Sequence, residues 1–141
     1  MNKRYHLLKT KCIHPELIAQ LALCGHGDKI LIADGNYPLA SKSGSAQKLY
    51  LGLAPNIPKV TDVIDAIQEI INVECIEVME EMPGQAPSIT EEFVAAFPTA
   101  QLILSERFQF YADCCHDDVK LAIFTGETRL FANLLITIAP A

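Results

Sequence analysis

The sequence feature that most constrains the fold is the five-residue run from Lys29 to Ala33, in which apolar side chains follow one another without alternation. A strand that exposes one face to water alternates polar and apolar residues, whereas a strand covered on both faces is apolar almost throughout. The run is also too short for a typical helix and is followed by turn-forming residues. We therefore expect a buried strand with helices on both sides of its sheet.

Helical spacing, turn residues and capping signals divide the rest of the chain into alternating helices and strands. Helices are predicted at residues 15–24, from Pro58 to Ile71, after a capping box at residues 88–91 and ending before Pro98, and at residues 106–115. Further strands are predicted at residues 48–53, 75–79, 101–104, 119–124 and 129–138, and a polar loop at residues 35–48. This order predicts one three-layer α/β domain over residues 1–141, with helices on both faces of a largely parallel or mixed sheet.

The composition excludes several classes of partner. The 141 residues carry a formal net charge of −6 and contain no cluster of Lys and Arg, so nucleic acid and anionic lipid are not expected partners. No apolar run reaches the length of a membrane span, and the first residues lack the apolar core of a secretory signal, which predicts a cytoplasmic protein. Hydrophobic residues make up 50% of the chain, which favours a buried sheet or a subunit interface.

Metal and nucleotide sites have little support in the sequence. The five cysteines form an odd set without CxxC spacing, which argues against a disulfide framework and a structural zinc site. The segment 114–118, CCHDD, does not indicate a metal site either, because adjacent residues on a helix point about 100° apart and cannot easily converge on one ion. The Gly25–Gly27 turn resembles part of a dinucleotide loop but precedes a strand instead of following one. We expect no metal and no cofactor.

Two ionisable residues flank the predicted buried strand, His26 before it and Asp34 directly after it. Ligands of open α/β sheets bind beyond the carboxyl ends of the strands, which makes Asp34 a candidate binding residue. His26 lies at the other end, but the turn through Gly25 and Gly27 could redirect it, or a neighbouring subunit could bring it to Asp34. The purely structural alternative is that His26 caps the preceding helix and Asp34 begins a turn.

Two further pairs are candidates for ligand binding. Arg107 and Tyr111 are spaced i, i+4 in a predicted helix, so they share a face and offer a guanidinium and a phenol to a hydroxyl-rich ligand. The structural alternative is a solvated Arg107 and a core Tyr111. In the predicted last strand, period-two geometry places Phe131 and Asn133 on the same face.

Three segments together resemble the D-ribose pyranase and L-fucose mutarotase family, and the fucose branch more closely: HPELIAQLALCGHGDKILIADGNYP, SERFQFYADC and LAIFTGETRLFANLLIT. The likeness extends over nearly the whole chain, and the order of its GHGD, RFxFY and TGE elements is specific. The resemblance implies an α/β fold, an isomerase that binds a monosaccharide, and ring-shaped homo-oligomers, commonly decamers. It also implies that the sites lie at subunit contacts.

The resemblance assigns roles to individual residues. The histidine of GHGD is the acid/base residue in that family, which implies this role for His26. The family's sugar-contacting residues correspond to Asp34, Arg107, Tyr111 and Asn133. The chain departs from the family at Phe131, where a tyrosine is typical, so a phenolic hydroxyl that helps to move a proton is missing.

These assignments favour a fucose mutarotase-like enzyme that interconverts the anomers of an aldose by acid/base-assisted ring opening. The reaction needs two proton-transfer groups, and histidine can serve in either direction near neutral pH. Two alternatives stay open at this point. One is a pyranose–furanose isomerase, and the other, for which Phe131 is the chief argument, is a non-catalytic sugar-binding or accessory module.

Overall fold

The computed structural model describes residues 7–141, which form four helices and one six-stranded sheet. The helices are α1 (Pro15–Leu23), α2 (Val60–Ile67), α3 (Thr90–Ala96) and α4 (Arg107–Cys114). The strands are β1 (Lys29–Ala33), β2 (Gln47–Tyr50), β3 (Val73–Met79), β4 (Gln101–Ser105), β5 (Val119–Phe124) and β6 (Leu134–Ile138).

The sheet is mixed, with the strand order β2-β5-β1-β6-β3-β4. Strand β1 pairs in parallel with β5, β5 with β2, and β3 with β4, whereas β6 runs antiparallel to both of its neighbours, β1 and β3. The carboxyl ends of all strands except β6 therefore lie at one edge of the sheet, which we call the carboxyl edge. The opposite side, where β1 and β3 begin, is the amino edge.

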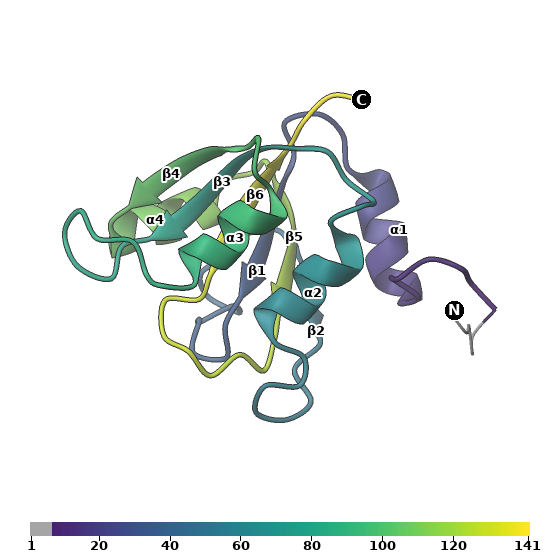
Figure 1. The fold of residues 1–141 in the computed structure, drawn as a ribbon, viewed down its shortest axis with the longest axis horizontal. Helices are drawn as coiled ribbons and strands as arrows, with labels where there is room; N and C mark the ends of the chain where they lie inside the picture. Colours follow the sequence, from purple (N-terminus) through teal and green to yellow (C-terminus); the bar gives the residue numbers. More distant parts are fainter. Residues whose placement is uncertain (1–6) are drawn as a thin grey trace.

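Helices cover both faces of the sheet, as the sequence predicted (Figure 1). Helices α1, α2 and α3 pack on one face, where their apolar side chains form a large core with Ile30 and Ile32 of β1. Helix α4 packs on the other face, where Phe110 and Cys114 form a smaller core with Leu31. The side chains of β1 alternate between these two cores, which explains why polar residues do not alternate with apolar ones in this strand.

The ends of two helices differ from the prediction. Helix α2 ends at Ile67, and Ile70, which continues the helical spacing, lies in a turn and is exposed. Helix α3 begins at Thr90 without a side-chain cap, so the predicted capping box is wrong. Backbone carbonyls replace the cap, because the amide of Thr90 donates to the Pro87 carbonyl at 3.0 Å in a preceding turn.

The last strand is shorter than predicted: β6 begins at Leu134, not at Arg129. Phe131 has φ 59°, a left-handed conformation that is rare for an aromatic residue and incompatible with a continuous strand. Arg129 is held outside the sheet by Glu127, whose carboxylate accepts a hydrogen bond from Arg129 Nε at 3.0 Å. Strand β2 also ends early, at Tyr50, and the amides of Leu51 and Gly52 after it both donate to the carbonyl of Phe124, at 2.9 and 3.2 Å.

Candidate functional site

A cavity of about 170 Å³ opens at the carboxyl edge of the sheet, next to α4. Asp34, directly after β1, and Met79, the last residue of β3, form part of its wall, and α4 supplies Arg107 and Tyr111. The remaining lining residues are Asn36, Tyr37, Leu130, Phe131 and Asn133. The parallel strands end together at this edge, so polar residues that are distant in the sequence converge there.

Asp34 and Asn133 are buried, and hydrogen bonds fix both side chains. The Asp34 carboxylate accepts the amide of Asn36 on Oδ1 at 2.9 Å and the amide of Ala132 on Oδ2 at 3.0 Å. The amide of Asp34 donates to Oδ1 of Asn133 at 2.8 Å. These bonds attach the segment before β6 to the end of β1, so Asp34 organises the cavity wall of which it is a part.

The pKa of Asp34 is raised by burial, and hydrogen bonds from the amides of Asn36 and Ala132 oppose this shift. Each carboxylate oxygen has a second lone pair besides the one that the backbone amide occupies. A hydroxyl-bearing ligand in the cavity can therefore donate to Asp34 without displacing its structural hydrogen bonds.

Arg107 and Tyr111 lie on the same face of α4, as their spacing predicted. The guanidinium Nε donates to the Tyr111 hydroxyl at 3.2 Å, and the guanidinium carbon lies 5.5 Å from the centre of the Tyr111 ring. Arg107 is exposed and Tyr111 is half-buried, with its ring 5.4 Å from that of Tyr37. The pair places a cation and a phenol at the mouth of the cavity.

Phe131 and Asn133 line the same cavity, although not for the predicted reason. Both precede β6, and the left-handed backbone at Phe131, not the alternation of a strand, directs the ring. The ring supplies an apolar wall without a hydroxyl. The hydroxyl of Tyr37, also in the lining, donates to the carbonyl of Lys42 at 2.7 Å, and burial raises the pKa of Tyr37.

Four lining residues were absent from the sequence-based set: Asn36, Tyr37, Met79 and Leu130. Three of them could have been predicted from the rule that ligands bind beyond the carboxyl ends of strands. Asn36 and Tyr37 lie two and three residues after Asp34, and Met79 ends β3, the neighbour of β6. Leu130 had no such signal, because its position depends on the irregular backbone before β6.

His26 does not reach this cavity within one chain. It lies at the amino edge, where its Nε2 is 3.0 Å from Oε1 of Glu74 and its side chain is 58% exposed. The whole of β1 lies between His26 and Asp34, and its five residues span about 17 Å. The amide of Gly27 donates to the carbonyl of Ile138, the last residue of β6, at 2.9 Å. This bond attaches the turn to the amino edge, so the turn does not carry His26 towards Asp34.

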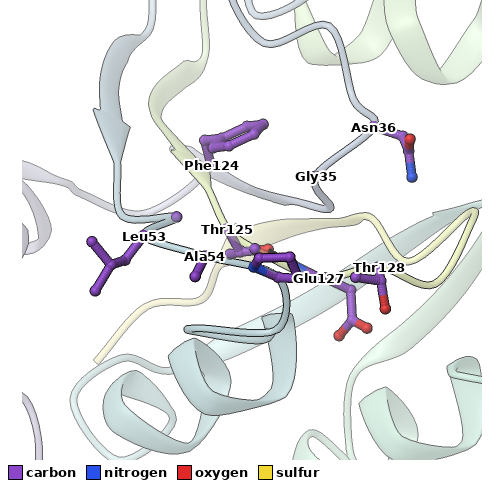
Figure 2. A pocket seen from close by; sticks show the side chains of 11 residues that line it. Gly35, Asn36, Leu53, Ala54, Phe124, Thr125, Glu127 and Thr128 are labelled. Atoms are coloured by element: carbon purple, nitrogen blue, oxygen red, sulfur yellow. Dashed lines mark hydrogen bonds between the residues drawn. The ribbon is translucent and has the colours of Figure 1, made fainter.

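A second hollow, of about 450 Å³, lies beside the first at the carboxyl edge (Figure 2). Asn36 lines both. Figure 2 shows the Phe124 ring on one side and the Glu127 carboxylate pointing away from it. Thr125 donates from its hydroxyl to the carbonyl of Ala33 at 2.7 Å, which ties the TGE turn to the end of β1.

Glu127 of the TGE turn is buried, and its contacts are structural. Its carboxylate accepts hydrogen bonds from Arg129 and from the amide of Val60 at the start of α2, at 3.0 and 3.3 Å. Burial alone would raise its pKa, but the hydrogen bonds from Arg129 outweigh it and lower the pKa. Within residues 7–141, no group of three His, Cys, Asp or Glu side chains could hold a metal ion. None of the described helices is long and apolar enough to cross a membrane.

The model of the RbsD / FucU transport protein family matches residues 7–139. The chain belongs to this family. A D-ribose pyranase of Variovorax paradoxus is 29% identical over 133 residues, which cover 91% of this chain and 94% of the relative. A D-ribose pyranase of Geobacillus kaustophilus is 29% identical over 128 residues, covering 91% and 90%.

Solved structures of the RbsD/FucU family share the fold. Bacillus subtilis RbsD complexed with D-ribose superposes with a TM-score of 0.82 at 24% identity, covering 96% of this chain and 99% of that one. A fucose mutarotase from Streptococcus pneumoniae in complex with L-fucose gives 0.76 at 24% identity, covering 96% and 99%. The α/β fold expected from the sequence is confirmed. The relatives named D-ribose pyranase confirm the expected enzyme class, an isomerase.

Proposed function

We propose that this member of the RbsD/FucU family is a monosaccharide mutarotase of the fucose mutarotase type. The observation that carries the proposal is the cavity at the carboxyl edge, where a carboxylate, an amide, a guanidinium and a phenol line a volume of about 170 Å³. This set of donors and acceptors matches the ring of hydroxyls that a sugar presents. The cavity is small, which favours a single sugar residue.

Ring opening of an aldose is an exchange of protons. A base removes the proton of the anomeric hydroxyl, an acid protonates the ring oxygen, and the bond between the anomeric carbon and the ring oxygen breaks. The carbonyl then rotates and the ring closes with the opposite configuration, which returns both protons. A histidine can perform either transfer near neutral pH, and the chemistry requires no cofactor.

In this proposal His26 moves the protons, and the residues of the cavity hold the sugar. Asp34 and Asn133 bind sugar hydroxyls, while Arg107 and Tyr111 orient the ring and Phe131 forms an apolar wall. His26 of a neighbouring copy reaches the cavity, since His26 of the same chain lies at the amino edge. This requires a homo-oligomer with sites at subunit contacts. The ring-shaped decamer and the cytoplasmic location inferred from the sequence remain predictions.

Magnetisation-transfer NMR on a panel of aldoses, including L-fucose and D-ribose, tests the activity. We expect faster exchange between the anomer signals of at least one sugar when the enzyme is added. No acceleration with any aldose at high enzyme concentration would contradict the enzymatic proposal. The ratio of furanose to pyranose exchange in the same spectra separates a mutarotase from a pyranase.

Mixing two inactive variants tests the shared site. His26→Ala and Asp34→Asn copies, unfolded and refolded together, would form some contacts in which both native residues meet. For random assembly at equal amounts, about a quarter of the sites would be native, and activity should return to about that fraction. The separately refolded variants, mixed without exchange of subunits, are the control. Failure to recover activity in proven mixed oligomers would contradict a site built from two copies.

A second candidate is a sugar-binding module without catalytic activity. Phe131 favours it, because the family's tyrosine would supply a proton-transferring hydroxyl at that position and the Tyr37 hydroxyl is already bonded to Lys42. Tight sugar binding together with unaccelerated anomer exchange would support this candidate over the mutarotase.

A further inference from the structure

One wall of the sugar cavity depends on an unusual backbone conformation. Phe131 lines the cavity, and its φ of 59° lies in the left-handed region, which a bulky side chain rarely adopts. Strained backbone of this kind persists only where the surrounding structure fixes it, and it is concentrated at functional sites. The contacts on either side of Phe131 therefore show what holds this wall in place.

The chain after Phe131 is attached to the end of β1. The amide of Ala132 donates to Oδ2 of Asp34 at 3.0 Å, and Oδ1 of Asn133 accepts the amide of Asp34 at 2.8 Å. All three residues are buried, which strengthens these hydrogen bonds relative to bonds in water. The side of the wall that leads into β6 is thus fixed to the sheet.

The chain before Phe131 is held by Arg129. Its Nε and Nη2 donate to the two carboxylate oxygens of Glu127, at 3.0 and 3.2 Å, and its Nη1 donates to Oε2 of Glu92 on α3 at 2.7 Å. The Glu127 side chain is 1% exposed, whereas those of Arg129 and Glu92 are 42% and 50% exposed. Two bonds from a guanidinium to one carboxylate fix orientation as well as distance. The buried Glu127 is therefore the main anchor, and Glu92 adds a contact at the surface.

Glu127 is itself fixed to α2 and to the sheet. Its carboxylate accepts the amide of Val60, the first residue of α2, at 3.3 Å. Its backbone carbonyl accepts the amide of Gly35 at 2.9 Å, and Gly35 directly follows Asp34. The two sides of the Phe131 wall are therefore anchored at adjacent residues after β1.

Arg129 does not line the cavity, so it is not a candidate sugar ligand. We propose instead that Arg129 is a positioning residue for the sugar site. Its bonds to the two carboxylates fix the chain two residues before Phe131 and so keep the ring in the cavity wall. This inference rests on the proposed function of the cavity. Lysine does not replace arginine in this role, because its ammonium group lacks the planar set of donors that pairs with both oxygens of a carboxylate.

Arg129→Lys tests the proposal, because it keeps a positive charge beside the buried Glu127 carboxylate and so spares the fold. Loss of the paired hydrogen bonds should lower the affinity for the aldose that binds the wild type best by about tenfold. Isothermal titration calorimetry measures the affinity, and urea denaturation establishes that each variant is folded. Lys11→Met is the matched control, because it removes an exposed ion pair with Asp65 in which neither residue lines the cavity. It should bind sugar like the wild type.

A double-mutant cycle separates positioning of the ring from a general loss of stability. In Phe131→Ala the ring is absent, so adding Arg129→Lys should change the affinity by less than about twofold. A tenfold loss in both backgrounds, or no loss in either, would overturn the inference. Where Phe131→Ala binds too weakly to measure, the position of the ring is followed directly.

Fluorine NMR follows the ring without any sugar. Fluorophenylalanine labels all six phenylalanines, and the variants Phe131→Tyr and Phe110→Leu identify the signals of these two rings. Arg129→Lys should shift the Phe131 signal, whereas the signal of Phe110, in the core under α4, should stay in place. Lys11→Met should move neither signal.

An unchanged Phe131 signal in Arg129→Lys would overturn the inference, whatever the protein binds. If the wild type binds no aldose, the proposed function fails, and the fluorine spectra still decide the role of Arg129. If the wild type and Arg129→Lys bind an aldose equally well, the proposed function stands and this inference fails.

Discussion

The two edges of the sheet differ in how completely one chain satisfies its polar groups. At the carboxyl edge, Asp34 and Asn133 are buried and bonded to the backbone. At the amino edge, His26 and Glu74 form a pair whose side chains are 58% and 44% exposed. The wall of the carboxyl edge is fixed by hydrogen bonds within one chain, whereas the imidazole at the amino edge is largely exposed beside Glu74. The proposed function divides sugar binding and proton transfer between these two edges.

The sharpest way to break this comparison is to remove the imidazole. His26→Ala should lower the rate of anomer exchange by about 10²- to 10⁴-fold, because an acid/base group contributes that much to a proton transfer. Sugar affinity and the free energy of unfolding should change little, since His26 is half-exposed. NMR exchange rates and calorimetry measure the two effects. Glu74→Gln, which removes only the partner of His26, is the control, and an unchanged rate in His26→Ala would refute the division.

The second test removes the carboxylate at the other edge. Asp34→Ala leaves the buried amides of Asn36 and Ala132 without acceptors, each at a cost of about 1–3 kcal/mol. We expect the free energy of unfolding to fall by about 3 kcal/mol in urea denaturation, together with a loss of sugar binding. Asp34→Asn keeps an acceptor oxygen and should lose less stability. A fully stable Asp34→Ala would show that the wall does not depend on this residue.

Phe131→Tyr sharpens the comparison by adding a proton-transfer group to the carboxyl edge. A phenol at this position should raise the exchange rate, by about 10²-fold if it acts as a general acid or base. Affinity should stay close to that of the wild type, because the ring already lines the cavity. Phe108→Tyr, at an exposed ring outside the lining, is the control. No gain in rate would show that proton transfer here does not use this wall.

The smallest effect is expected from Arg107→Met. The exposed guanidinium contributes a cation at the cavity mouth, and methionine keeps much of the length of the side chain without the charge. Sugar affinity should fall by about tenfold, equivalent to about 1.4 kcal/mol, with no loss of stability. Titration calorimetry measures the affinity, and Lys59→Met, at an exposed residue before α2, is the control. An affinity equal to that of the wild type would exclude Arg107 from sugar binding.

The regular parts of the fold could be predicted where a local signal and the tertiary structure agree. Strands β1 and β5 have the bounds that their apolar runs predicted. The start of β6 could not be predicted, because residues 129–133 have the composition of a strand while Asp34 and Glu127 hold them in another path. The capping box failed for a similar reason, since a turn at Pro87 supplies the bonds that a cap would make.

The candidate site divides in the same way. Arg107 and Tyr111 share a face because one helix contains both, so their spacing alone was sufficient. Phe131 and Asn133 lie together through an irregular backbone that the expected strand did not anticipate. The placement of His26 depends on the path of the turn before β1, and spacing along the chain does not determine that path.

The sequence by itself determined the α/β class, the order of its elements and five of the nine residues that line the cavity. It did so because apolar periodicity and strand ends are local properties of the chain. Only the tertiary structure decided that Asp34 organises its own cavity wall, that His26 lies at the opposite edge, and that the backbone adopts a left-handed conformation at Phe131 before β6 begins. These outcomes depend on hydrogen bonds and on burial between segments that are distant in the sequence, and a local sequence pattern does not predict the energies of such contacts.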